Sequence, residues 1–133
     1  MDEIRVYVEA EINPTESEDK VKRAVENVFG NVPVEVRPAR EGSLLVVKAE
    51  GTEALTKLYN LLRRERIRAA ARGVLFEGLR GKTIVFHLNK QVAYAGHVSF
   101  CKPVAESPLG PIKVQIECES PRQVIEWLAP RTM

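Results

Sequence analysis

The stretch IRVYVEAEI, residues 4–12, alternates strictly between apolar and polar side chains. Because successive side chains of a β-strand point to opposite faces, this pattern predicts a strand that is buried on one face and exposed on the other. The apolar set is Ile4, Val6, Val8, Ala10 and Ile12. PIKVQIECE, residues 111–119, alternates in the same way. We therefore expect a sheet with one apolar and one polar face.

Three helices are predicted outside these strands. The first follows the capping-box spacing of Thr15 and Glu18 and ends at Gly30. The second covers about residues 52–79 and is bent or broken near Gly73. The third begins after Ser120, which has a capping-box partner three residues later, and ends before the proline at position 130.

Four more β-rich runs complete the order β-α-β-β-α-β-β-β-α. They are VPVEVR (32–37), SLLVVKAE (43–50), TIVFHL (83–88) and AGHVSFC (95–101). This order predicts an α+β fold of two layers, with an antiparallel or mixed sheet and helices packed on one face. At 133 residues the chain is the size of one domain, so we expect a single domain over residues 1–133.

The composition excludes several classes of protein. Hydrophobic residues make up 44% and charged residues 29% of the chain, which is typical of a globular domain rather than a disordered one. No apolar run has the length that crosses a bilayer, and the acidic, alternating N-terminus is unlike an export signal. We expect a cytoplasmic protein without membrane contact, whose two cysteines stay reduced.

Charge is distributed unevenly along the chain. The net charge is +2, but residues 57–105 contain ten basic and two acidic residues, so this segment carries +8 and the rest carries −6. On one continuous helix, four basic residues would fall within about 80° of the helix surface: Lys57, Arg64, Arg68 and Arg72. An ion-paired surface helix would interleave acids at i+3 and i+4, and here Glu65 is the one acid among the arginines.

Guanidinium groups suit phosphate, since their planar forks form paired charge-assisted hydrogen bonds. Alternatively, the stripe pairs with acidic segments of the same chain.

A second basic region follows in RGKTIVFHLNKQVAYAG, residues 80–96, which contains Lys82 and no acid. Asn89, Lys90 and Gln91 are expected in a polar turn between strands, where an ammonium and two amides are available to phosphate, sugar or base edges. The alternative is that the two amides bind the backbone of their own turn. Because acids line the polar faces of the first and last predicted strands, 4–12 and 111–119, we expect the helix and this loop to contact any nucleic acid.

Patterns typical of catalysis or metal binding are weak. His87, His97, Cys101 and Cys118 are of ligand type, but no short-spaced pair such as C-x-x-C occurs. The sequence contains no P-loop, dinucleotide fingerprint or nucleophile elbow. We therefore expect no catalytic residue, no cofactor and no metal.

Several stretches together resemble an archaeal family of uncharacterised proteins that is described as RNA-binding and is linked, by prediction, to the exosome. They are LRRERIRAAAR (62–72), FHLNKQVAYAG (86–96), SFC (99–101), LGPI (109–112) and WLAPRT (127–132). The resemblance implies a fold similar to that of the ribosomal protein that binds 5S RNA. The matching positions are Arg66, Arg72, Asn89, Lys90, Gln91 and residues 127–131. Arg68 and Ala69 depart from the family pattern of an apolar residue followed by an acid.

We therefore hypothesise a non-catalytic RNA-binding protein that uses the basic helix and the Asn-Lys-Gln loop, in or near an RNA-processing complex. Its expected RNA contacts are Lys57, Arg64, Arg66, Arg68, Arg72, Lys82, Asn89, Lys90 and Gln91. The alternative hypothesis is a protein-interaction module whose basic helix docks on an acidic partner or on a second copy in a homodimer. We expect Trp127 to pack on the core rather than to form a surface site.

Overall fold

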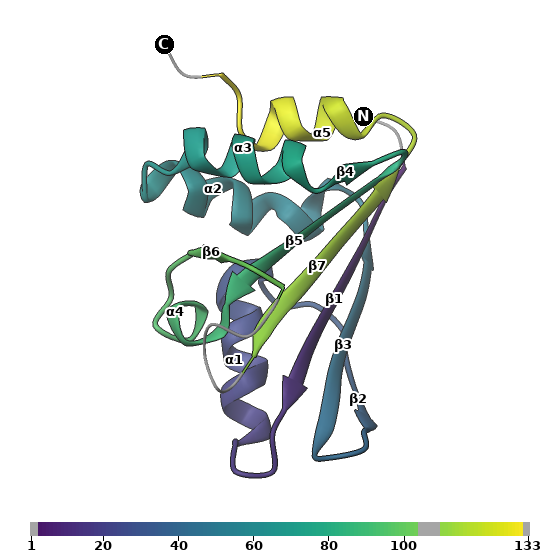
Figure 1. Cartoon of the computed structure of the whole chain (residues 1–133), viewed down its shortest axis with the longest axis vertical. Helices are drawn as coiled ribbons and strands as arrows, with labels where there is room; N and C mark the ends of the chain where they lie inside the picture. The colour runs from purple at the N-terminus through teal and green to yellow at the C-terminus, as the bar shows by residue number, and fades with distance from the viewer. Residues whose placement is uncertain (1–2, 104–109, 132–133) are drawn as a thin grey trace.

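Residues 3–103 and 110–131 are described by the computed structural model, in which they form a seven-stranded antiparallel sheet and five α-helices (Figure 1). The strands are β1 (Ile4–Ile12), β2 (Val34–Pro38), β3 (Ser43–Glu50), β4 (Leu79–Arg80), β5 (Thr83–Asn89), β6 (Phe100–Cys101) and β7 (Pro111–Cys118). The helices are α1 (Glu18–Phe29), α2 (Thr56–Arg64), α3 (Arg68–Glu77), α4 (Lys90–Tyr94) and α5 (Pro121–Leu128), and the short 3₁₀ helix η1 (Thr52–Leu55) precedes α2. The predicted α+β class is confirmed. The element order matches the prediction roughly, since the long second helix is divided into α2 and α3 and two elements, β4 and α4, are added.

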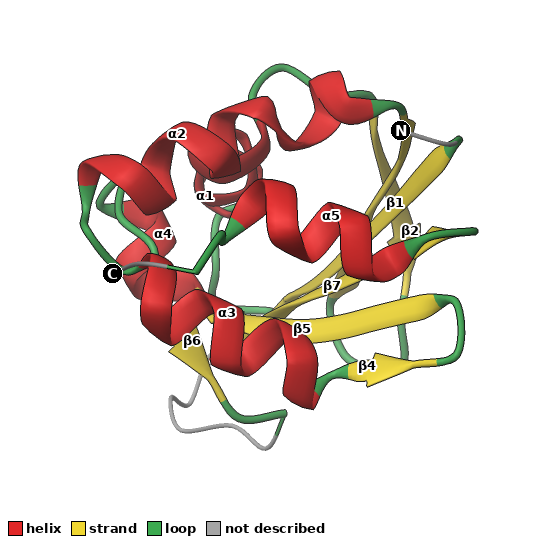
Figure 2. Ribbon diagram, turned by 90° about the horizontal axis from the view of Figure 1, so that it is seen from above, coloured by secondary structure: helices red, strands yellow, loops and turns green. Residues whose placement is uncertain are grey.

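The sheet runs in the order β2-β3-β1-β7-β5-β4, and β6 pairs with β5. The central strand β1 lies between β3 and β7, so that Val8 is opposite both Val47 and Val114. All five apolar residues of the alternating stretch 4–12 are buried. The core lies between this face and the helices, which gather on the same side of the sheet (Figure 2). Each large core side chain contributes roughly 1.5–3 kcal/mol of hydrophobic stabilisation.

The long helical pattern is broken, but not at Gly73, which lies inside α3. Helix α2 ends at Arg64, and the next residues form a Schellman turn. Its two hydrogen bonds run from the Ile67 N–H to the Leu62 carbonyl (3.1 Å) and from the Arg66 N–H to the Arg63 carbonyl (3.2 Å). Arg66 has a φ of 56°, a left-handed conformation that usually requires glycine. The prediction of a break at Gly73 was therefore wrong in position.

The expected turn at Asn89, Lys90 and Gln91 was also incorrect. Asn89 is the N-cap of α4, and its side chain accepts a hydrogen bond from the Val92 N–H. The chain turns through this short helix, so the expected strand at 95–101 is reduced to β6. At the first helix, Ser17 rather than Thr15 is the N-cap. None of the helices in the described part of the chain is long and apolar enough to span a membrane.

Candidate nucleic-acid interface

The break at Arg66 divides the predicted basic stripe. Because α3 turns back from α2, residues on the two helices no longer share one helical surface (Figures 1 and 2). Lys57 is exposed near the start of α2, where its Nζ donates to the Glu26 carbonyl of α1 at 3.0 Å. The expectation that Lys57 aligns with Arg68 and Arg72 on one continuous helix is therefore wrong.

Arg72 is held by the C-terminal end of α5. Its guanidinium donates to the Ala129 carbonyl at 3.2 Å and to the Glu126 carboxylate at 2.6 Å, and the side chain is 18% exposed. The hydrogen bond from Arg72 also lowers the pKa of the Glu126 carboxyl from its ordinary value. Because the last carbonyls of a helix have no partner within the helix, Arg72 satisfies one of them. The alternative interpretation, pairing with acids of the same chain, holds for Arg72.

Arg63 caps the same helix end. Its guanidinium donates to the carbonyls of Trp127 and Leu128, each at 3.2 Å. It also lies over the ring of Tyr59, 3.4 Å from the centroid, and that ring stacks on Trp127 with 4.8 Å between centroids. Within the stretch 62–72, these contacts account for Arg63 and Arg72, and the packing expected for Trp127 is confirmed.

Three more of the predicted RNA contacts have structural partners. Lys90 is buried, and its ammonium donates to the Glu11 carbonyl at 2.6 Å and to the Glu16 carboxylate at 3.1 Å. Lys82 forms an exposed ion pair with Glu119 at 2.7 Å. The Asn89 side chain accepts a hydrogen bond from the Val92 N–H as the N-cap of α4. Lys90 is therefore not the exposed loop ammonium that the sequence indicated.

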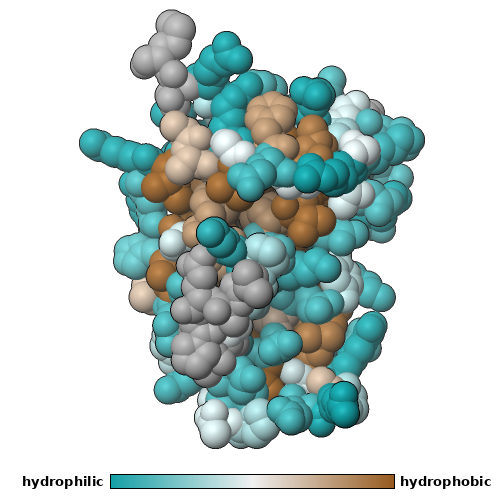
Figure 3. Space-filling view, viewed as in Figure 1, coloured by the Kyte–Doolittle hydropathy of each residue, from teal (hydrophilic) through white to brown (hydrophobic). Residues whose placement is uncertain are grey.

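The three remaining arginines, Arg64, Arg66 and Arg68, are defined here as the basic turn; Arg64 and Arg66 are exposed and Arg68 is half-buried. The Arg64 side chain is 64% exposed and donates to the Gly96 carbonyl at 3.1 Å. Within the described residues, the guanidinium groups of Arg66 and Arg68 have no hydrogen-bond or ion-pair partner. Figure 3 shows hydrophilic side chains projecting at the left margin, at the level of the α2–α3 turn of Figure 1. Arg64 also lies 3.6 Å from the Glu65 carboxylate, so Arg66 and Arg68 are the members of the basic turn whose charge is available to an external anion.

Glu65, the acid within this turn, faces inward. Its carboxylate accepts a hydrogen bond from the Val98 N–H at 3.1 Å and lies 2.7 Å from Nδ1 of His97, and it is 16% exposed. Burial raises the pKa of this carboxyl, but the hydrogen bonds from Val98 and His97 outweigh burial and lower the pKa below its ordinary value. The negative charge of Glu65 is therefore satisfied within the fold.

These contacts also bring the basic turn next to α4. Gly96 and His97 follow α4 directly, and both are bound by the end of α2, so the basic turn and the α4 region share one side of the molecule (Figure 1). On α4, Gln91 is exposed and the Tyr94 side chain is 36% exposed. The sequence leaves open whether the basic helix and the loop at 89–91 share one face; in the structure, Arg64 contacts the segment that follows α4, and Gln91 and Tyr94 are the exposed residues of α4.

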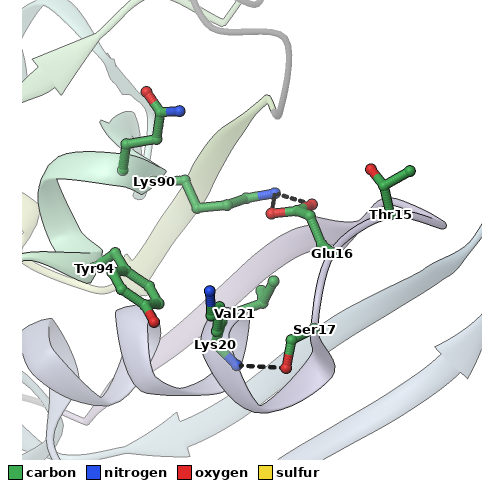
Figure 4. Close-up of a pocket in the computed structure, with 8 residues that line it drawn as sticks. Thr15, Glu16, Ser17, Lys20, Val21, Lys90 and Tyr94 are labelled. Carbon is green, nitrogen blue, oxygen red and sulfur yellow. Dashed lines mark hydrogen bonds and ion pairs between the residues drawn. The ribbon is translucent and has the colours of Figure 1, made fainter.

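A groove lies between α4 and the start of α1 (Figure 4). We call it the α4 pocket; its volume is about 420 Å³ and its lining residues are Thr15, Glu16, Ser17, Lys20, Val21, Lys90, Gln91 and Tyr94. Sequence patterns did not predict this pocket, because the residues of its two walls are 69 or more positions apart in the chain and no sequence motif singles out Tyr94. No group of three or more metal-ligating side chains lies within residues 3–103 and 110–131.

Comparison with known proteins assigns the chain to a family. Residues 5–118 match a family model described as RNA binding. UPF0201 proteins of two archaea are similar over nearly the whole chain: that of Pyrobaculum aerophilum is 45% identical, covering 97% of this chain and 91% of the relative, and that of Aeropyrum pernix is 44% identical, covering 98% and 87%. The crystal structure of a UPF0201 protein from Methanococcus jannaschii has a TM-score of 0.84 and 32% identity, covering 97% of this chain and 95% of that one. The chain therefore belongs to the archaeal UPF0201 family, whose matching model carries the description RNA binding.

Proposed function

We propose that this protein binds RNA through the basic turn and the adjoining surface of α4, without converting the RNA chemically. The single observation that carries the proposal is the environment of Arg66 and Arg68, whose guanidinium groups have no acidic partner in the described residues while the neighbouring Glu65 is turned inward. The description of the matching family model as RNA binding supports the same class of ligand.

The basic turn supplies contacts to the phosphate backbone. Guanidinium forks bind phosphate oxygens in pairs, and such contacts position a nucleic acid without reading its sequence. The turn is rigidly placed, because Glu65 and Arg64 bind the segment that follows α4. Affinity is then dominated by charge and falls as salt concentration rises.

The remaining basic residues of the sequence-based hypothesis act in support of this surface. Arg72 holds α5, Lys57 holds the end of α1, and Lys90 holds the loop that precedes α1. Lys82, between β4 and β5, is instead paired with Glu119, which lies just before α5, and has no contact with the basic turn in the described residues. The proposal therefore narrows the phosphate contacts to Arg64, Arg66 and Arg68.

The cellular role that we propose rests on the family resemblance described above. We propose a cytoplasmic RNA-binding protein that acts beside an RNA-processing complex such as the exosome, with a fold related to that of the ribosomal protein that binds 5S RNA. The competing proposal is that the basic turn docks on an acidic protein surface or on a second copy of this chain, because a cationic patch attracts either kind of partner.

Fluorescence anisotropy with a labelled RNA pool at low salt tests the proposal. The wild-type protein is compared with R64A/R66A/R68A and with the matched control R40A/K48A/R80A, which removes three exposed charges elsewhere on the molecule. We expect the basic-turn variant to lose most of its affinity and the control to keep it. Equal losses in both variants would contradict a defined site. If neither the wild type nor the variants bind RNA, and gel filtration shows a salt-sensitive dimer, the protein-docking alternative is favoured.

A further inference from the structure

The α4 pocket differs chemically from the basic turn beside it. Two of its polar lining residues, Lys90 and Glu16, neutralise each other, and Glu16 also accepts hydrogen bonds from the backbone and side chain of Asn13. Glu18 and Asp19 occupy the first turn of α1 next to the pocket. Acidic residues at this end of α1 repel phosphate, so the pocket favours a neutral group.

Tyr94 provides the aromatic surface of this pocket. It is one of two large apolar or aromatic side chains that are exposed in the described part of the chain; the other is Val36, on the edge strand β2. The ammonium of Lys20 lies 5.7 Å from the ring centroid of Tyr94. In Figure 4, Tyr94 and Lys20 come from different helices and lie on the same side of the pocket. An exposed ring of this kind offers a face on which a planar group can stack.

The backbone beneath Tyr94 is fixed before any ligand binds. The side-chain amide of Asn27 on α1 donates to the carbonyls of Ala93 and Tyr94, at 3.0 and 3.2 Å. Asn89 caps the start of α4, and the Ala95 N–H donates to the Gln91 carbonyl at 3.3 Å. A preorganised platform loses little conformational entropy on binding, which favours affinity.

The remaining lining residues can recognise the edge of a planar ring. Thr15 and Ser17 carry hydroxyl groups and Gln91 carries an amide, so donors and acceptors surround the aromatic face. The volume of about 420 Å³ lies within the range of small-ligand sites. Hydroxyls and amides around an aromatic face are the groups with which proteins bind unpaired bases.

We propose that the α4 pocket binds one unpaired nucleobase, stacked on Tyr94, while the basic turn binds the phosphates of neighbouring nucleotides. This inference rests on the proposed RNA-binding function and specifies its ligand as single-stranded RNA. A base inside a duplex is already stacked and paired, so it is not available to the pocket. Arg64 joins the two sites, because it binds Gly96, which lies two residues after Tyr94.

The test compares Y94A, Y94F and the matched control V36A in binding to an unstructured RNA 12-mer and to a blunt-ended RNA duplex, which has no unpaired base. We expect Y94A to weaken binding of the 12-mer by about 5- to 150-fold, the loss of one stacked base, with the salt dependence unchanged. Y94F keeps the ring and should bind like the wild type, as should V36A. The duplex should bind more weakly than the 12-mer, and its binding should be insensitive to Y94A.

A 12-mer containing 2-aminopurine supplies a second readout, because stacking quenches its fluorescence. Quenching by wild type and Y94F but not by Y94A supports the pocket. Salt-sensitive binding that depends on the basic turn, with no effect of Y94A on affinity or quenching, would overturn the pocket and leave the proposed function intact. Failure of every RNA to bind the wild type would overturn both. Thermal unfolding of each variant shows whether it is folded.

Discussion

Glu65 and His97 join two segments that are 32 residues apart: Oε2 of Glu65 lies 2.7 Å from Nδ1 of His97. The second carboxylate oxygen accepts the backbone N–H of Val98 at 3.1 Å. Together these contacts fasten the turn between α2 and α3 to the segment after α4. They turn the acid of an arginine-rich stretch away from the surface and set the geometry of the proposed interface.

Replacing Glu65 by Gln should therefore destabilise the fold and loosen the interface. Loss of the charge-assisted contacts is expected to cost about 1–3 kcal/mol of unfolding free energy, measured by urea denaturation. RNA affinity should fall as well, although the variant is less acidic than the wild type. If RNA affinity rises with the added positive charge, the orienting role of Glu65 is wrong.

The stability contribution of Glu65 should depend on pH. Its pKa is lowered in the folded protein, because the hydrogen bonds from Val98 and His97 outweigh the effect of burial. A group with a depressed folded pKa contributes stability above its unfolded value of 4.5, and this contribution is lost as the pH falls through the folded pKa. Between pH 5 and about 3, the wild type should lose more stability than E65Q. Parallel curves for the two proteins would contradict this assignment.

Arg66 provides a prediction in which stability and binding change in opposite directions. A non-glycine residue in the left-handed region is strained by about 1–2 kcal/mol, part of which is offset by the greater unfolded-state entropy of glycine. R66G should therefore be more stable than the wild type by about 0.5–1 kcal/mol, while its RNA affinity decreases. A destabilised R66G would show that the side chain contributes more to the fold than its exposed position indicates.

The predictable part of the fold is the part that short-range patterns determine. Alternation along residues 4–12 and 111–119 predicted both strands and the buried face, since the side chains of a strand alternate regardless of tertiary context. The break between α2 and α3 was misplaced, because glycine is the usual residue at a Schellman turn and here the position is Arg66. Gly73 remains helical inside α3.

The candidate site was less predictable, because the partners of its charges are distant in sequence. Glu126 is 54 residues from Arg72, and Glu16 is 74 residues from Lys90, so no local spacing reveals these pairs. Its helical spacing predicted Arg72 as a phosphate contact, but the Arg72 side chain binds the C-terminal end of α5. Charge density indicated the region of the surface that we propose as the interface, but tertiary contacts decide which of its arginines lack a partner in the fold.

Arg72 should accordingly behave as a structural residue. R72A leaves the Ala129 carbonyl and Glu126 without the guanidinium, which should cost about 1–3 kcal/mol of unfolding free energy. RNA affinity at a temperature where the variant is folded should equal that of the wild type. A loss of RNA affinity as large as that of R68A would place Arg72 in the interface after all.

Lys90 should be essential to the fold rather than to RNA binding. K90M removes the partner of the part-buried Glu16 carboxylate and is expected to destabilise the protein by about 3–5 kcal/mol. The double variant K90M/E16Q removes the uncompensated charge and should recover part of that loss. If the double variant is no more stable than K90M, the ion pair is not the source of the effect. Both measurements use chemical denaturation.

The salt dependence of RNA binding tests the central claim most directly. The affinity of the wild type and of R64A/R66A/R68A for an unstructured RNA is measured from low to moderate salt. We expect the logarithm of the wild-type affinity to fall steeply with the logarithm of salt concentration, and the variant to flatten this slope by about 2, which is about 0.7 for each of three phosphate contacts. An equal slope in both proteins would show that phosphate binds elsewhere, and the basic turn would not be the RNA-binding site.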